Sequence, residues 1–122
     1  MNAMLTAGAL IASVAPATAA DSLPLGNWAR GDGNARVSIE RCGAAICAVN
    51  TWIKDTSDGE QVGHKLVMNL KPTGPGKLAG TAFDPQRDRT YNLTIDFGAA
   101  RMSTRGCIIG ILCKTVSWTK AP

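Results

Sequence analysis

The four cysteines are the residues whose type and spacing suggest covalent chemistry. Four residues separate Cys42 from Cys47, and five separate Cys107 from Cys113. These gaps do not match the paired two-residue gaps of a zinc ribbon, and no histidine stands nearby, so zinc is a weak interpretation. In an oxidising compartment an even number of cysteines favours two disulfides, for which three pairings exist.

A hairpin with Ala44-Ala45 at its tip would place the sulfurs of Cys42 and Cys47 opposite each other, within the short Cα separation that a disulfide requires. The segment from Cys107 to Cys113 would close a second small loop in the same way. We therefore expect two local pairs, and a long-range pairing between the two groups stays open. Each local bridge is worth about 2 to 3 kcal/mol, so it fixes loop shape more than global stability.

Other side chains suited to catalysis are scarce. The single histidine, His64, stands in a polar turn region, where we expect it to be solvated. One histidine and oxidised cysteines cannot supply a Ser/His/Asp, Cys/His or paired-carboxylate set. We therefore expect no enzyme, no metal and no cofactor.

The basic residues suggest at most a local anion site. If clustered, the arginines that follow Pro85 would form an anion-binding rim for a lipid head group or acidic sugar, but a solvated barrel edge is the interpretation we favour. These residues are Arg87, Arg89, Arg101 and Arg105. The whole chain has 13 Lys+Arg against 9 Asp+Glu, a mild excess of +4. That excess is too small to predict a nucleic-acid partner.

Residues 1–20 have the pattern of a secretory signal peptide. They carry no charged side chain, contain an apolar stretch and end in the small-residue run Ala17-Thr18-Ala19-Ala20. Pro16 interrupts the apolar stretch, which is too short for a membrane-spanning helix. Cleavage would leave residues 21–122 as the mature domain, without a transmembrane segment. We expect this domain to be periplasmic or secreted, where disulfides persist.

Past residue 20, apolar and polar residues alternate and turn residues separate the runs, which predicts strands and no helix. Between Thr90 and Phe97, for example, every second residue is apolar. Eight candidate strands follow: Leu25–Arg30, Ala35–Cys42, Cys47–Lys54, Lys65–Lys71, Lys77–Phe83, Thr90–Phe97, Arg101–Cys107 and Lys114–Lys120.

These strands must form one domain, because 122 residues leave no room for a second core. Short connections allow sequential strands to be antiparallel neighbours. A meander of about eight strands that closes on itself makes a barrel just wide enough for side chains or one small ligand. We predict an all-β, antiparallel, up-and-down eight-stranded barrel, with a sandwich as the alternative.

Motifs along the mature chain resemble a known bacterial family. They are Gly26-Asn27-Trp28, Val37-Ser38-Ile39, Cys42-Gly43, Cys47, Trp52, Gly80, Phe83-Asp84-Pro85, Arg89-Thr90-Tyr91, Arg105-Gly106-Cys107, Gly110, Leu112-Cys113 and Trp118-Thr119. This pattern resembles the bacterial domain of unknown function 2147 (DUF2147). The resemblance implies export and a lipocalin-like barrel with a small-molecule cavity, and it adds little about chemistry. The chain departs from the family pattern at Ala48 and Asn50, which bears on the size and polarity of that cavity.

A lipocalin-like barrel gives the Gly26-x-Trp28 element a role in closing one end. Trp28 would plug the barrel, and Lys120 from the last strand would lie across its ring as a cation–π partner. Trp28 as an ordinary core aromatic is compatible with this interpretation and needs no ligand.

Two functions fit the predicted barrel. The first is an exported module that binds a small, largely apolar ligand in the interior. The alternative is an envelope or secreted protein-interaction factor with a filled barrel, no ligand and Cys-closed contact loops. The predicted lining is Val37, Ile39, Asn50, Trp52, Leu66, Met68, Tyr91, Leu93, Ile95, Phe97, Met102 and Trp118. An internal void of a few hundred Å³ would favour the first function, and a filled barrel the second.

Asn50 is the polar member of this lining. If Trp52 faces the interior, Asn50 does too, because residues two apart in a strand share a side. Asn50 would then orient a ligand in an apolar pocket bounded by Trp52, Tyr91 and Trp118. The opposite register is nearly as favourable, and it would leave Asn50 in solvent and turn Val49, Thr51 and Ile53 inward.

Overall fold

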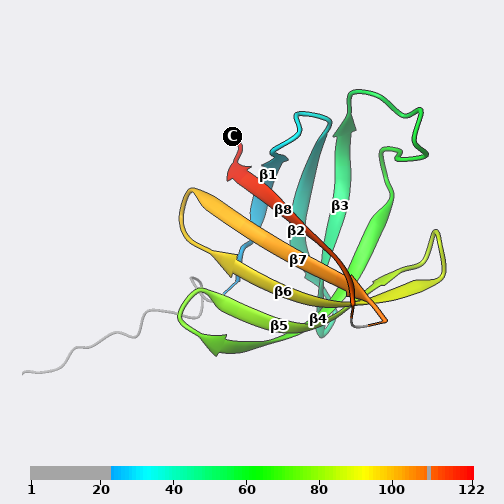
Figure 1. Ribbon diagram of the computed structural model, residues 1–122. Helices are drawn as coiled ribbons and strands as arrows, with labels where there is room; N and C mark the ends of the chain where they lie inside the picture. Colours follow the sequence, from blue (N-terminus) through cyan, green and yellow to red (C-terminus); the bar gives the residue numbers. More distant parts are fainter. Residues whose placement is uncertain (1–22, 110) are drawn as a thin grey trace, which may run out of the picture.

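Eight antiparallel strands follow one another around a closed barrel (Figure 1). The computed structural model describes residues 23–109 and 111–122, so the predicted signal peptide, residues 1–20, lies outside the described residues. The strands are β1 (Gly26–Arg30), β2 (Ala35–Cys42), β3 (Ala45–Ile53), β4 (Lys65–Gly74), β5 (Lys77–Asp84), β6 (Arg89–Phe97), β7 (Arg101–Ile108) and β8 (Leu112–Lys120). Each pairs with the next, and β1 also pairs with β8. The predicted up-and-down barrel is confirmed, because this last pairing closes the sheet.

The strands match the predicted ones to within three residues at each end, and two of the turns differ from the prediction. The β2–β3 hairpin turns at Gly43-Ala44 and not at Ala44-Ala45, since Gly43 has a φ of 72° and Cys42 pairs with Ala45. Strand β4 runs past Pro72 to Gly74, whereas the predicted strand ended at Lys71. A proline is tolerated there because β3 pairs with β4 only as far as Met68, so its missing N–H interrupts no ladder.

The alternation of side chains fills the barrel. On β6, Leu93 and Ile95 are buried while Asn92, Thr94 and Asp96 are exposed. Ten buried side chains form the core: Trp28, Val37, Ile39, Ile46, Met68, Leu78, Ala82, Leu93, Ile95 and Met102. Partly buried residues pack against them, so side chains occupy the centre of the barrel.

The up-and-down order divides the connections between two ends. We call "loop end" the end with the β1–β2, β3–β4, β5–β6 and β7–β8 turns, and "plug end" the end with the other three turns and the C-terminus (Figure 1). The longest connection, residues 54–64, belongs to the loop end. None of the described residues forms a helix long and apolar enough to cross a membrane.

Candidate functional site

Trp28 closes the plug end in the way its position predicted. Only 1% of the residue is exposed, and its Nε1 donates a hydrogen bond to the Pro24 carbonyl oxygen at 2.9 Å. The Lys120 ammonium lies 4.8 Å from the Trp28 ring centroid and donates to the Leu25 carbonyl oxygen at 2.6 Å. The predicted cation–π pair is therefore confirmed, and it ties the first strand to the last.

Gly26 leaves space for this cation. A Cβ atom at Gly26 would lie 2.6 Å from the Lys120 Nζ, and the backbone there has a φ of 112°. An L side chain rarely adopts that conformation. Both defining residues of the Gly-x-Trp element therefore contribute to closing this end: Trp28 fills it, and Gly26 leaves room for the Lys120 ammonium.

The predicted lining residues meet in the interior, but mostly as packed core. Six are buried: Val37, Ile39, Met68, Leu93, Ile95 and Met102. Four are partly buried against them: Leu66, Tyr91, Phe97 and Trp118. The Trp118 indole also donates to the Thr104 hydroxyl at 3.0 Å. These contacts are those of a structural core.

The prediction that Trp52 lines the barrel interior is wrong. It is 42% exposed, and the Arg36 guanidinium lies 5.4 Å from its ring centroid. Trp52 pairs with Arg36 whereas Asn50 pairs with the next residue, Val37, so Thr51 is extra and forms a bulge. The extra residue reverses the side on which Trp52 lies, because a bulge breaks the period of two.

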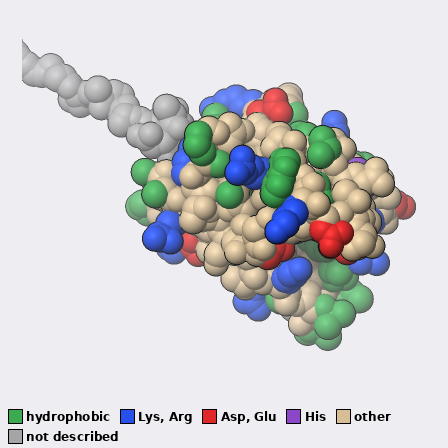
Figure 2. Space-filling model, turned by 90° about the horizontal axis from the view of Figure 1, so that it is seen from above, with side chains coloured by type: hydrophobic (Ala, Val, Ile, Leu, Met, Phe, Trp, Pro, Cys, Tyr) green, Lys and Arg blue, Asp and Glu red, His purple; other side chains and the backbone are tan. Residues whose placement is uncertain are grey.

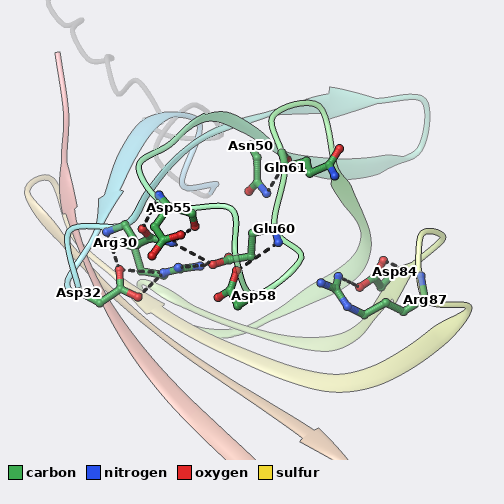
Figure 3. Close-up of polar contacts among 10 residues, drawn as sticks. Arg30, Asp32, Asn50, Asp55, Asp58, Glu60, Gln61, Asp84 and Arg87 are labelled. Carbon is green, nitrogen blue, oxygen red and sulfur yellow. Dashed lines mark hydrogen bonds and ion pairs between the residues drawn. The ribbon is translucent and has the colours of Figure 1, made fainter.

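Asn50 pairs across the sheet with the buried Val37. Its side-chain amide, however, hydrogen-bonds to loop 54–64 and does not face a pocket (Figure 3). Its Nδ2 donates to the Gln61 carbonyl oxygen at 3.1 Å. Its backbone N–H donates to the His64 carbonyl oxygen at 2.9 Å, and its carbonyl accepts from the Gly63 N–H at 2.8 Å. The predicted pocket around Asn50 therefore lacks its Trp52 wall, and Asn50 anchors loop 54–64.

An ion-pair network holds the same loop to the β1–β2 turn (Figure 3). The Arg30 guanidinium donates to both Glu60 carboxylate oxygens, at 2.5 and 2.8 Å, and to Asp32 at 3.0 Å. Asn34 adds a donor to Glu60 at 3.2 Å. The Arg30 hydrogen bonds lower the pKa of Glu60 to about 2 and raise that of Arg30. The network is satisfied within itself and fastens the loop.

A second charged pair orders the β5–β6 turn. Buried Asp84 accepts from the Arg87 guanidinium at 2.9 Å and from the Gln86 side chain at 2.6 Å. Burial raises the pKa of Asp84, but hydrogen bonds from Arg87 and Gln86 outweigh it and the net pKa is lowered. Arg87 therefore has a structural role, because its ion pair with Asp84 holds the β5–β6 turn.

The four arginines after Pro85 do not form one rim. Arg87 and Arg89 lie at the loop end, whereas Arg101 begins β7 at the plug end and Arg105 lies within β7. Strand β6 separates the two ends by roughly 26 Å, at about 3.3 Å per residue. The hypothesis of a single anion-binding rim is therefore wrong.

His64 is half-buried and not simply solvated as predicted. Its Nδ1 atom is buried and has no hydrogen-bond partner among the described residues. The pairing of its carbonyl with the Asn50 N–H explains this position, because it draws the end of loop 54–64 back onto the sheet.

An open pocket of about 460 Å³ lies beside the β4–β5 turn, toward the plug end. Its lining combines the β4–β5 turn with β6, β7, β8 and Gly31, and of the buried core it includes Met102 alone among the described residues. Phe97 and Trp118, both predicted to line a cavity, also border it. The remaining lining residues are Pro75, Gly76, Lys77, Asp96, Arg101, Ser103, Ser117 and Thr119.

Both predicted local disulfides are present and confirm the pairing. Cys42 bonds Cys47 and Cys107 bonds Cys113, with Cα separations of 5.8 and 4.0 Å. Cys107 and Cys113 are direct cross-strand partners at the end of the β7–β8 hairpin. The second bridge therefore closes the turn at its base.

That turn presents an apolar tip, which we define as Ile108, Ile109, Ile111 and Leu112. Ile109 is 82% exposed, Ile111 80% and Leu112 65%. Ile109 also has a φ of 57°, a conformation that costs a β-branched residue about 1 to 3 kcal/mol. Sequence reasoning had not singled out these side chains. The signal was there, since a loop this short between paired cysteines cannot fold its aliphatic residues back onto the core.

The hairpin that carries the tip is purely basic. From residue 97 to 122 the sequence contains four cations, Arg101, Arg105, Lys114 and Lys120, and no Asp or Glu. Arg105 and Lys114 are exposed, flank the disulfide and form no ion pair with another described residue. Figure 2 shows hydrophobic side chains gathered at one protruding corner of the molecule, with Lys or Arg and also Asp or Glu side chains near it.

No group of three or more His, Cys, Asp or Glu side chains that could hold a metal occurs in residues 23–109 and 111–122. The structure is a closed up-and-down barrel with two disulfides and a buried hydrophobic core. The chain belongs to the family described as "Uncharacterized protein conserved in bacteria (DUF2147)", whose model matches residues 26–120. No curated protein and no solved structure matches the chain significantly.

Proposed function

We propose that this protein is an exported envelope factor, a rigid barrel that presents the apolar tip to a partner. The exposure of Ile109, Ile111 and Leu112 carries the proposal. Soluble proteins expose single apolar residues routinely, but a contiguous exposed group marks an interaction site. The disulfide at the base of the tip lowers the entropy that docking would cost.

Export is supported by two independent features of the chain. Residues 1–20 have the pattern of a signal peptide. Both cysteine pairs are bonded, and disulfides persist in the periplasm or outside the cell.

The packed core favours an interaction factor over an interior carrier. Large side chains such as Ile39, Met68 and Ile95 belong to one buried cluster inside the barrel. A ligand there would have to displace them from close packing.

Fractionation of cells tests this function. We expect the wild type to stay with the envelope after osmotic shock, and the variant Ile109→Ser/Ile111→Ser to be released with the soluble periplasm. Val62→Ser is the matched control, since Val62 is 61% exposed on loop 54–64 and lies outside the tip. Equal release of all three proteins would overturn the proposal, as would a protein that stays in the cytoplasm.

A second candidate function is the binding of a small, largely apolar molecule in the open pocket beside Phe97, Met102 and Trp118. The pocket volume of about 460 Å³ favours it, because ligand sites commonly have about 300 to 1,000 Å³. Native mass spectrometry of protein taken from the periplasm should show an added mass, and Ser117→Phe should remove it by filling the pocket. An unliganded wild type would argue against this function.

A further inference from the structure

We infer that the partner of the apolar tip is the surface of an anionic lipid bilayer, into which Ile109, Ile111 and Leu112 insert. The inference rests on the proposed function and deepens it by naming the partner. It draws on the chemistry of the tip, the charge of the hairpin behind it and the bonding of the turn.

The tip is purely aliphatic. Ile108, Ile109, Ile111 and Leu112 offer neither a polar atom nor an aromatic ring beyond the backbone. Protein interfaces concentrate their binding energy in Trp, Tyr and Arg side chains that fill shaped pockets. Hydrocarbon tails require no shape complementarity and gain from the removal of any aliphatic surface from water. The composition of the tip therefore favours lipid over a protein groove.

The charges behind the tip complement an anionic surface. Arg105 lies two residues before Cys107, and Lys114 directly follows Cys113, so both stand at the base of the inserted segment. Neither has an ion-pair partner among residues 23–109 and 111–122. Since the hairpin has no carboxylate, nothing on it opposes attraction to anionic head groups. Basic residues behind apolar ones are the arrangement that holds peripheral proteins at an interface.

The backbone of the turn also suits a shallow insertion. Unpaired peptide groups are costly in hydrocarbon. One hydrogen bond spans the turn, from the Ile111 N–H to the Ile108 carbonyl oxygen at 3.4 Å, and the disulfide between Cys107 and Cys113 closes its base. The short turn limits insertion to the side chains of the tip, and leaves the guanidinium and ammonium groups at head-group depth.

Vesicle sedimentation with the processed, oxidised protein from the periplasm tests the inference. We expect binding to vesicles of phosphatidylethanolamine and phosphatidylglycerol, and much weaker binding to phosphatidylcholine alone. Ile109→Ser/Ile111→Ser should lower the partition coefficient by at least about tenfold, because it removes two inserted side chains. Lys114→Gln and Arg105→Gln should each lower it by about fivefold on the anionic vesicles. Added salt should weaken wild-type binding.

Two matched variants separate the tip from the rest of the surface. Val62→Ser removes an exposed aliphatic group at the same end of the barrel, and Lys71→Gln removes an exposed cation on β4. Both should bind vesicles as the wild type does. Unfolding curves of all variants should be alike, because the substituted side chains are exposed.

Each alternative occupant has its own outcome. Equal vesicle binding by wild type and Ile109→Ser/Ile111→Ser would overturn insertion through the tip. If the tip substitutions release the protein from the envelope fraction but the wild type does not bind vesicles of pure lipid, the partner is a protein. The proposed function would then still hold. If sedimentation velocity shows a dimer that the double substitution dissociates, and vesicles do not bind, the tip contacts a second copy of the chain.

Discussion

The Lys120 ammonium lies over the ring of Trp28, 4.8 Å from its centroid, although 91 residues separate the two in the chain of 122. The two residues are also backbone partners at the junction of β1 and β8. Closure of the barrel and closure of its plug end therefore occur at the same place.

Trp28 should carry most of the stability of this junction. Trp28→Ala is expected to lower the free energy of unfolding by about 3 to 5 kcal/mol, as truncation of a large buried aromatic does. Lys120→Ala should cost far less, since an exposed cation–π contact is worth about 0.5 to 1 kcal/mol. Urea unfolding curves measure both. A Trp28→Ala variant as stable as the wild type would mean that Trp28 does not close the barrel.

Gly26 should resist substitution for two separable reasons. Gly26→Ala is expected to destabilise the fold by at least about 1 kcal/mol, because of its φ and its contact with Lys120. In a Gly26→Ala/Lys120→Ala variant the contact is absent and the backbone cost remains, so the double substitution should cost less than the sum of the single ones. Strict additivity in thermal or urea unfolding would show that the Lys120 contact is irrelevant.

Acid should weaken the anchoring of loop 54–64. The pKa of Glu60 is about 2 in the folded protein against an ordinary 4.5, so the unfolded chain takes up the proton first. The contribution of Glu60 is therefore complete above about pH 4.5 and declines as the pH falls toward 2.

Glu60→Gln isolates this contribution. At pH 7 the variant should be less stable than the wild type by about 1 kcal/mol, near the upper limit for an ion pair close to the surface. The difference should shrink between pH 4.5 and 2, the interval between the two pKa values. Urea unfolding over this range measures it, and a difference that does not change with pH would contradict the ion-pair account.

Asn50→Leu should release the same loop from the sheet. The substitution leaves the Gln61 carbonyl without its side-chain donor, which is expected to cost about 0.5 to 1.5 kcal/mol. Hydrogen exchange in loop 54–64 should become faster. Asn69→Leu, on the exposed side of β4, is the control and should change neither quantity. Unaltered exchange in the Asn50→Leu loop would mean that other contacts hold it.

Much of this fold could be predicted because its information is local. Alternation in segments such as Thr90–Phe97 predicted the strands, and short connections predicted their antiparallel order. The two cysteine pairs are close in sequence, so local bridges were geometrically simple. The plug pair was expected from the family resemblance, and the pairing of β1 with β8 brings it together.

The side on which Trp52 lies was beyond the reach of such patterns. The period of two holds along β3 as far as Asn50, and the bulge at Thr51 then reverses it. A bulge depends on how two strands pair and on the loop that follows, and the alternation of apolar and polar residues in one strand predicts neither.

The sequence by itself predicted the set of strands and their order, carried the motifs of the family and favoured local disulfides, whose pairing the structure then decided. The tertiary structure alone decided that Asn50 holds a loop, that Arg87 and Arg101 stand at opposite ends, and that most of the predicted lining residues pack as a hydrophobic core. It also decided that Ile109 and Ile111 are exposed. The physical reason is that alternation within a strand is a local property, whereas burial depends on which strands and loops meet in space.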